Sequence, residues 1–308
     1  MLRPSLPTRT LCESKALLNG CSQIFLQQHP LCGLLILLAI AVAAPQLLGG
    51  ALLGGFAGAL TARQRHYAED AIEAGLYSYN GVLLGLLLCY TFAWSPLLPL
   101  LIIASGGISA MLLNPLLQRS RQRQWLPAYT SPFVVLSWLL LVIAAPLQLT
   151  PAVAIASPAL SFDGLNLCAA IARGVGQVIF LDQPLAGLIL FAGLLVASRR
   201  AACWALLGST AGLGLALLQG WPTPTALAGL YGYNAALAAL ALSQNCRQPW
   251  APLLGIVLAL LLQPGFAALG LPALTAPFIL ACWLVQAGSR LLRNPAADCA
   301  PHGRKSRG

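Results

Sequence analysis

The sequence predicts an all-α polytopic membrane protein made of two inverted repeats of five transmembrane helices, each repeat with a re-entrant half-helix. The first observation is composition: 58% of the 308 residues are hydrophobic and only 8% are charged, whereas soluble domains carry about 25% charged residues. The second is that the apolar residues fall in runs of roughly 15–22, the length of a transmembrane helix. The third is a set of motifs that occurs once in each half of the chain.

The first repeat is expected to cover residues 16–149, after a polar and basic tail at residues 1–15. Residues 16–29 are too short and too polar to cross a membrane, and Pro30 interrupts helical hydrogen bonding at their end. They are therefore predicted to form a half-helix that leads into a first span ending near residue 44. Four further spans are expected from the remaining apolar runs, at residues 47–62, 75–92, 97–117 and 126–149.

The second repeat is expected to cover residues 168–292, between a proline-containing linker at 150–167 and a basic tail at 293–308. It follows the plan of the first repeat, because a short apolar stretch at 168–182 again precedes a proline, Pro184. Five spans are expected after it, at residues 184–197, 202–219, 229–243, 250–270 and 276–291.

Arginines occur in alternate loops of this plan. They lie in the expected loops near residues 63, 121, 199, 247 and 293, whereas the loops between them contain neither Lys nor Arg. Because Lys and Arg mark cytoplasmic loops, both termini are expected to be cytoplasmic. Five spans per repeat is an odd number, so the second repeat must be inverted relative to the first. Such folds bind their substrate near the middle of the membrane, between the repeats.

Three motifs recur in the same order in both halves. Gly-Leu-Tyr-x-Tyr-Asn-x-x-Leu occurs at 75–83 and again at 229–237, 154 residues later. At the same offset, residues 20–33 match residues 174–187 in Gly, Gln, Pro, Leu and Gly. Residues 126–133 match residues 271–278 in Leu-Pro-Ala-x-Thr-x-Pro-Phe, at an offset of 145. Shared Gln, Asn and Thr are more specific than shared leucines, so the motifs indicate a duplicated chain.

These motifs resemble those of the urea transporter family, and the resemblance covers roughly residues 16–290. It implies two inverted halves of five helices, each with a re-entrant pore half-helix, around one pore per subunit. It further implies a homotrimer in the plasma membrane, here a bacterial inner membrane, which lets urea pass passively down its gradient. Membrane lipid is then a partner, and neither a cofactor nor a nucleic acid is expected.

The resemblance also assigns roles to individual residues. Gln23 and Gln177 would offer side-chain amide oxygens to the N–H groups of urea, and Thr130 and Thr275 would offer hydroxyls at a narrow central position. Half-helices that end inside the membrane would add unpaired backbone carbonyls. The walls of a slot that holds urea flat would be Ile24, Leu26, Tyr79, Leu83, Val178, Phe180, Tyr233 and Leu237. Family members more often have Phe at the positions of Leu26, Tyr79 and Tyr233.

Structural roles compete with these assignments. A Gln in a membrane helix is often a hydrogen-bond partner for a neighbouring helix. Asn80 and Asn234 are expected to hold the half-helices in place rather than to bind substrate, and the arginine clusters to set topology.

Other functions were weighed against passive urea transport. An ion-coupled transporter usually needs ionisable groups inside the membrane, and we expect no span to carry a central charge, because all seven acidic residues fall in loops, tails or segment edges. An uncoupled path for another small neutral solute, such as ammonia or a short amide, remains open. The sequence has no carboxylate pair, histidine cluster or Cys-x-x-Cys, so neither an enzyme nor a metal site is expected.

Overall fold

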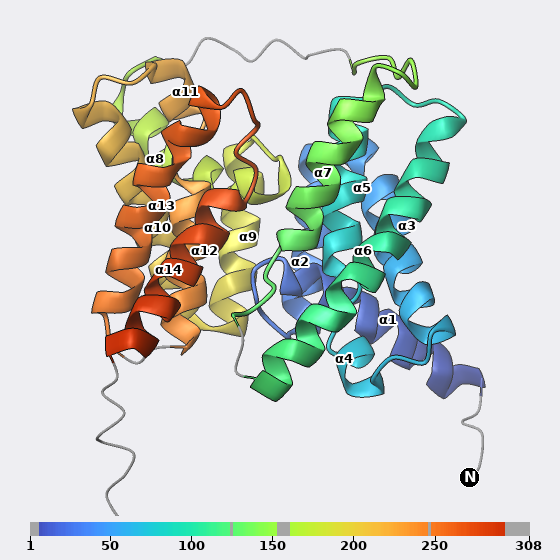
Figure 1. The fold of residues 1–308 in the computed structure, drawn as a ribbon. Coiled ribbons are helices and arrows are strands. Elements are labelled where there is room, and N and C mark those ends of the chain that lie inside the picture. Colours follow the sequence, from blue (N-terminus) through green and yellow to red (C-terminus); the bar gives the residue numbers. More distant parts are fainter. Residues whose placement is uncertain (1–5, 124–125, 153–160, 246–247, 293–308) are drawn as a thin grey trace, which may run out of the picture.

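The computed structural model describes residues 6–123, 126–152, 161–245 and 248–292. Secondary structure in these ranges is helical, apart from one backbone bridge between Phe92 and Pro151. Figure 1 shows two groups of helices side by side, one formed by α1–α7 and the other by α8–α14. The expected all-helical membrane fold is confirmed.

Seven helices make up the first group. They are α1 (Leu6–Gln23), α2 (Pro30–Ala43), α3 (Pro45–Gln64), the short α4 (Glu69–Glu73), α5 (Tyr79–Thr91), α6 (Leu97–Arg123) and α7 (Ser131–Ala144). Prolines occupy the first turn of α2, α3 and α7. A proline is well placed there, because the first helical N–H groups have no partner within the helix.

Seven helices and one 3-10 turn make up the second group. They are α8 (Gly164–Gly176), η1 (Gln177–Ile179), α9 (Pro184–Ala197), α10 (Arg199–Leu218), the short α11 (Thr223–Leu227), α12 (Tyr233–Asn245), α13 (Trp250–Ala268) and α14 (Ala276–Leu292). The order of long and short helices is that of α1–α7. In Figure 1, α1 and α4 lie at the lower end whereas α8 and α11 lie at the upper end, so the second group is inverted.

Backbone conformation repeats together with the helices. Leu26 and Phe180 both have left-handed φ values, 57° and 62°, and they are 154 residues apart. Tyr129 and Leu274, 145 residues apart, both have φ 45°. Left-handed backbone is uncommon for residues other than Gly. Its recurrence at matched positions therefore supports the duplication more strongly than helix lengths do.

The half-helices meet the next helix at a sharp angle. The chain bends by 75° between the half-helix formed by α8 and η1 and the helix α9 that follows it. The chain turns at Phe180, and Pro184 then starts α9. The same turn separates α1 from α2 at Leu26 and Pro30.

Several expected spans are shorter as helices than the apolar runs that predicted them. In the described chain, three helices are long and apolar enough to cross a membrane alone, Leu97–Gln122, Arg199–Leu218 and Trp250–Ala268, and the bent pair of α8 and α9 would make a fourth span. α2, α5 and α7 are apolar but have only 14, 13 and 14 residues. Turns and short helices such as α4 extend these elements at their ends.

Two helices begin earlier than expected. α1 begins at Leu6, inside the range that we expected to be a tail, and α8 begins at Gly164, inside the expected linker. The carboxylate of Asp163 explains the early start of α8, because it accepts a hydrogen bond from the backbone N–H of Asn166 at 2.8 Å and so caps the helix. Hydrogen bonds from the Ser161 hydroxyl and this N–H lower the pKa of Asp163. The expected tail at 293–308, with Arg293, and the loop residue Arg247 lie outside the described residues.

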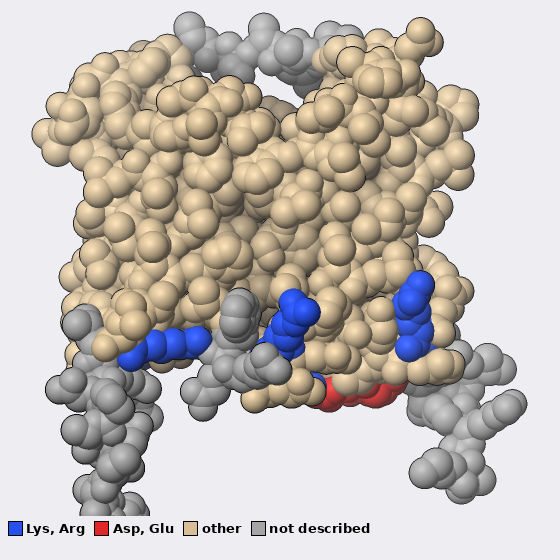
Figure 2. Space-filling model, in the orientation of Figure 1, with Lys and Arg blue, Asp and Glu red and all other residues tan. Residues whose placement is uncertain are grey.

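The arginines at helix ends gather at one end of the molecule. Arg63, Arg121, Arg199 and Arg290 lie at or near ends of α3, α6, α10 and α14. In Figure 2 the visible Lys and Arg side chains, and the visible Asp and Glu side chains, all lie at the lower end. Arg121 and Asp70 form an exposed ion pair there, with 3.0 Å between nitrogen and oxygen. This arrangement is typical of one membrane surface.

Candidate substrate path between the two repeats

The two repeats meet at a pair of threonines. The hydroxyl oxygens of Thr130 and Thr275 lie 2.7 Å apart in a hydrogen bond, and each residue is only 3% exposed. Thr130 precedes α7 and Thr275 precedes α14, so each comes from the same position of its repeat. The pair therefore marks the axis that relates the repeats.

Two tryptophans join the repeats near this pair. The indole N–H of Trp138 donates to the carbonyl of Pro272 at 2.9 Å, and the indole N–H of Trp283 donates to the carbonyl of Pro127 at 2.8 Å. Each bond links the last helix of one repeat, α7 or α14, to the segment that precedes the last helix of the other repeat. They hold the threonine segments against each other from both sides.

The amides of Gln23 and Gln177 are held in equivalent orientations. Nε2 of Gln23 donates to the carbonyl of Ala74, and Nε2 of Gln177 donates to the carbonyl of Ala228, both at 3.0 Å. A backbone carbonyl can only accept, so it selects the NH₂ side of each amide. Oε1 of each glutamine then points away from the C-terminal end of α4 or α11, where Ala74 and Ala228 hold the NH₂ groups. Both glutamines have a structural bond and keep an acceptor for another molecule.

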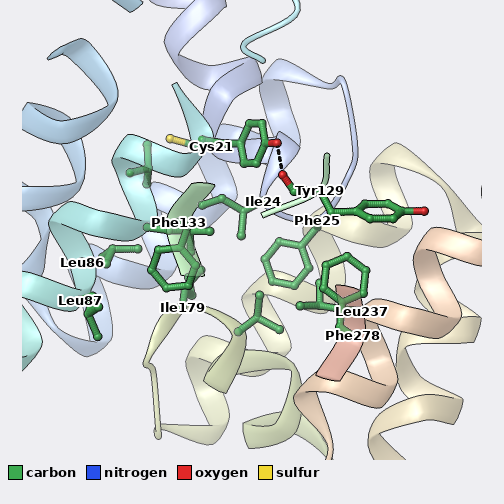
Figure 3. Packing of buried hydrophobic residues seen from close by; sticks show 14 of the residues in the cluster. Cys21, Ile24, Phe25, Leu86, Leu87, Tyr129, Phe133, Ile179, Leu237 and Phe278 are labelled. Atoms are coloured by element: carbon green, nitrogen blue, oxygen red, sulfur yellow. Dashed lines mark hydrogen bonds between the residues drawn. The ribbon is translucent and has the colours of Figure 1, made fainter. Parts of the chain in front are cut away.

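The apolar residues assigned to the slot lie in one core that draws on both repeats. Ile24, Tyr79 and Leu83 of the first repeat are buried in it together with Val178 and Leu237 of the second. Leu26, Phe180 and Tyr233 pack against this core and are partly exposed. Figure 3 shows Ile24 and Phe25 gathered with Ile179, Leu237 and Phe278.

Tyr79 uses its hydroxyl within the protein. It donates to the backbone carbonyl of Tyr129, the bond drawn at Tyr129 in Figure 3. The Tyr129 hydroxyl accepts from Nε2 of Gln286 at 2.7 Å, and its ring meets the ring of Phe278 edge-on with centroids 5.0 Å apart. Tyr79 therefore presents its ring to the core, which is how a phenylalanine at this position would act.

Asn80 and Asn234 hold a different element from the one expected. Their Oδ1 atoms accept from the backbone N–H groups of Phe133 and Phe278, at 3.2 Å and 3.3 Å. These N–H groups lie in the first turns of α7 and α14, so the asparagines fix those helices and not the half-helices α1 and α8. Asn80 and Asn234 therefore have a structural role, as expected, but they hold α7 and α14 and not the half-helices.

The end of the first half-helix exposes fewer free carbonyls than the sequence led us to expect. The carbonyl of Phe25 accepts from Nε2 of Gln27 at 3.0 Å, and that of Gln27 accepts from the Ser22 hydroxyl at 2.7 Å. Tight turns also use the carbonyls of Ser22 and Gln23. Side chains satisfy backbone groups that would otherwise be costly inside a membrane.

The shared motifs of the two repeats did not reveal a contact made by the end of α5 and by the end of its counterpart, α12. The ring of Tyr90, at the end of α5, stacks on the ring of Phe180 with centroids 5.4 Å apart and 25° between planes. Nε2 of Gln244, at the matched position in α12, donates to the carbonyl of Leu26 at 3.1 Å. Each repeat thus covers the turn after the other repeat's half-helix. The identities at 90 and 244 differ, so the repeat motifs did not include them.

A buried cation was also missed. Arg173 lies in α8 and is only 8% exposed. Its Nε donates to the carbonyl of Asp182 and one terminal nitrogen donates to the carbonyl of Leu227, both at 3.1 Å. The expectation concerned the spans, and Arg173 adds a buried charge in the half-helix α8 that it did not cover. Arg173 falls in the short apolar stretch at 168–182, and its position four residues before Gln177 is the signal in the sequence that could have found it.

Comparison with known proteins identifies the family. A sequence model of the family described as urea transporter matches residues 14–290. Urea transporter 1 of sheep is 29% identical over 291 residues, covering 87% of this chain and 74% of the sheep protein. Urea transporter 1 of goat is 30% identical over the same length and coverage, and that of mouse is 29% identical over 279 residues, covering 85% of this chain and 68% of the mouse protein. The chain belongs to the urea transporter family.

Proposed function

We propose that this chain lets urea cross the membrane passively, through one path per subunit that runs between the two repeats. Gln23 and Gln177 lie toward its two ends, the threonine pair lies at its centre, and the apolar core residues form its walls. The protein moves its substrate without chemical change and is not an enzyme.

The observation that carries this proposal is the matched orientation of the two glutamine amides. Urea is planar and neutral, with four N–H donors and one acceptor. To leave water it needs acceptors for those N–H groups and a thin apolar slot. Each glutamine keeps Oε1 as an acceptor because a backbone carbonyl takes its NH₂ group. Since the threonine oxygens are 2.7 Å apart, urea passes beside the pair in this conformation and not between them.

Replacing Gln177 with alanine tests the path. We expect urea flux into liposomes to fall about fivefold, because one hydrogen bond is worth about 1 kcal/mol. The matched control is Gln219→Ala, which removes an exposed glutamine at the end of α10. Melting temperature and the amount of reconstituted protein are measured for both variants. Wild-type flux through a folded Gln177→Ala variant would exclude Gln177 from the path.

Passive transport predicts that urea flux depends on the urea gradient alone. At a fixed urea gradient, an added pH or sodium gradient is expected to leave the initial rate of flux unchanged. Ion-coupled transporters use ionisable groups in the membrane, and the described acidic residues other than Glu13, which is within α1, lie near chain turns and helix ends. Accumulation of urea against its gradient, driven by either ion, would replace the passive mechanism with a coupled one. The same assay with ammonia and acetamide tests whether other small neutral solutes share the path.

The assembly and its orientation belong to the same proposal. The family resemblance supports a homotrimer surrounded by lipid in the plasma membrane, a bacterial inner membrane for this chain. The basic residues at one end of the molecule support a cytoplasmic location for both termini. Mass measurement of the complex in detergent, and protease access to tags at each terminus in oriented vesicles, test these two points.

A further inference from the structure

One feature breaks the symmetry between the half-helices. Arg173 of α8 and Asn19 of α1 are 154 residues apart and so occupy the same position of their repeats. Nδ2 of Asn19 donates to the carbonyl of Glu73 at 2.8 Å, and the guanidinium of Arg173 donates to the matched carbonyl, that of Leu227, at 3.1 Å. One repeat makes this link with a neutral amide and the other makes it with a cation.

The charge is therefore not needed for the link itself. Burying a charged group is costly unless it is well paired. The guanidinium of Arg173 donates its hydrogen bonds to two backbone carbonyls. Asp182 is the acidic residue nearest in sequence. Its carbonyl accepts from the guanidinium, and its carboxylate, on an exposed residue, also attracts the Arg173 charge. The matched position in the first repeat holds the neutral residue Asn19. The positive charge of Arg173 therefore points to a role beyond the hydrogen bond that both residues make.

That field acts close to the proposed path. Arg173 and Gln177 are four residues apart, so their side chains share one face of the half-helix about one turn apart. Their acceptors, the carbonyls of Leu227 and Ala228, are consecutive. Phe180, in the turn that follows, is one of the wall residues. A solute that reaches the Gln177 amide therefore comes within a few ångströms of the guanidinium, in surroundings where charge is poorly screened.

We propose that Arg173 is a specificity-determining residue that excludes cations from the urea path at the end formed by the second repeat. This inference rests on the proposed function, because it places the path beside Gln177. The relevant cations resemble urea in size and in N–H donors: ammonium, methylammonium and above all guanidinium, which is as flat as urea. The apolar walls disfavour these cations through the cost of desolvation, whereas the amide oxygens that accept urea would also accept their N–H groups. A fixed positive charge repels them and leaves neutral urea unaffected.

The test compares urea with guanidinium in liposomes that contain the full chain. Arg173→Asn copies the residue of the sister repeat, Arg173→Gln keeps an N–H donor on a longer side chain, and Arg173→Lys keeps the charge. We expect both neutral variants to carry urea within twofold of the wild-type rate and to admit radiolabelled guanidinium at least tenfold faster. Arg173→Lys is expected to exclude guanidinium as the wild type does.

Other outcomes separate this inference from the proposed path. Guanidinium exclusion that survives in a folded, urea-conducting Arg173→Asn variant would overturn the role of Arg173 and leave the path intact. Failure of both neutral variants to fold would also overturn it, because the link would then need the charge. Normal urea flux in Gln177→Ala, by contrast, would show that the proposed path is wrong.

Discussion

Replacing Gly85 with valine is expected to prevent the protein from reaching its folded form. A Cβ atom at Gly85 of α5 would lie 1.9 Å from the carbonyl oxygen of Gly50 in α3, and one at Gly81 would lie 2.2 Å from the carbonyl oxygen of Gly54. The two helices therefore touch through their backbones, as small residues permit in membrane proteins. Backbone atoms cannot move aside as a flexible side chain can. Overpacking of this kind costs ~3 kcal/mol or more, a large part of the stability of a domain.

The measurement is the yield of monodisperse protein in detergent, together with its melting temperature. The control is Gly214→Ala in α10, the sister helix of α3, where an added Cβ meets nothing within 4 Å. Because alanine favours the helix over glycine by about 1 kcal/mol, this control is expected to be as stable as the wild type or more so. A Gly85→Val protein with wild-type yield and melting temperature would contradict the close contact of α3 and α5.

Replacing both Thr130 and Thr275 with valine is expected to reduce urea flux at least tenfold without unfolding the protein. The two hydroxyls satisfy each other in a buried hydrogen bond. Replacing both partners with apolar groups of the same shape costs little stability, whereas removing one leaves a buried hydroxyl unpaired at about 1–3 kcal/mol. The double variant is therefore expected to melt at a higher temperature than either single variant. Urea in its path would meet only apolar groups at the centre and lose about 1.4 kcal/mol or more, which is tenfold in rate.

The experiment measures melting temperature and urea flux for the two single variants and the double variant. Thr210→Val is the matched control, because Thr210 is exposed on α10 and its hydroxyl bonds only within its own helix, to the carbonyl of Leu206. Wild-type flux through the double variant would remove the threonine pair from the path. A double variant less stable than both single variants would contradict the hydrogen bond between them.

Local signals in the sequence predicted most of the helices. Pro30 and Pro184 mark the first turns of α2 and α9, because proline lacks the N–H that a helix interior requires. The motifs at 75–83 and 229–237 predicted the starts of α5 and α12, which begin at Tyr79 and Tyr233. Helix ends without such residues were less certain, and so the early starts of α1 and α8 were missed.

The motifs could not predict which residues of one repeat contact residues of the other. They showed that Thr130 and Thr275 correspond, but correspondence alone does not place two side chains 2.7 Å apart. Tyr90 and Gln244 differ in identity, and their partners, Phe180 and Leu26, belong to the opposite repeat. Comparing one repeat with the other finds what the two share, and it passes over the places where they differ.

The sequence by itself determined the membrane fold, the duplication and the inversion. It could do so because hydrophobic length, proline and repeated polar residues act on the chain locally. Only the tertiary structure decided which atom of each glutamine amide is held, which helices Asn80 and Asn234 fix, and that α3 and α5 touch through their glycines. It also decided that Arg173 is buried and that it bonds to the carbonyl of Leu227 as Asn19 bonds to the matched carbonyl of Glu73 in the first repeat. These properties depend on where distant backbone carbonyls lie, and that position follows from the packing of the whole chain.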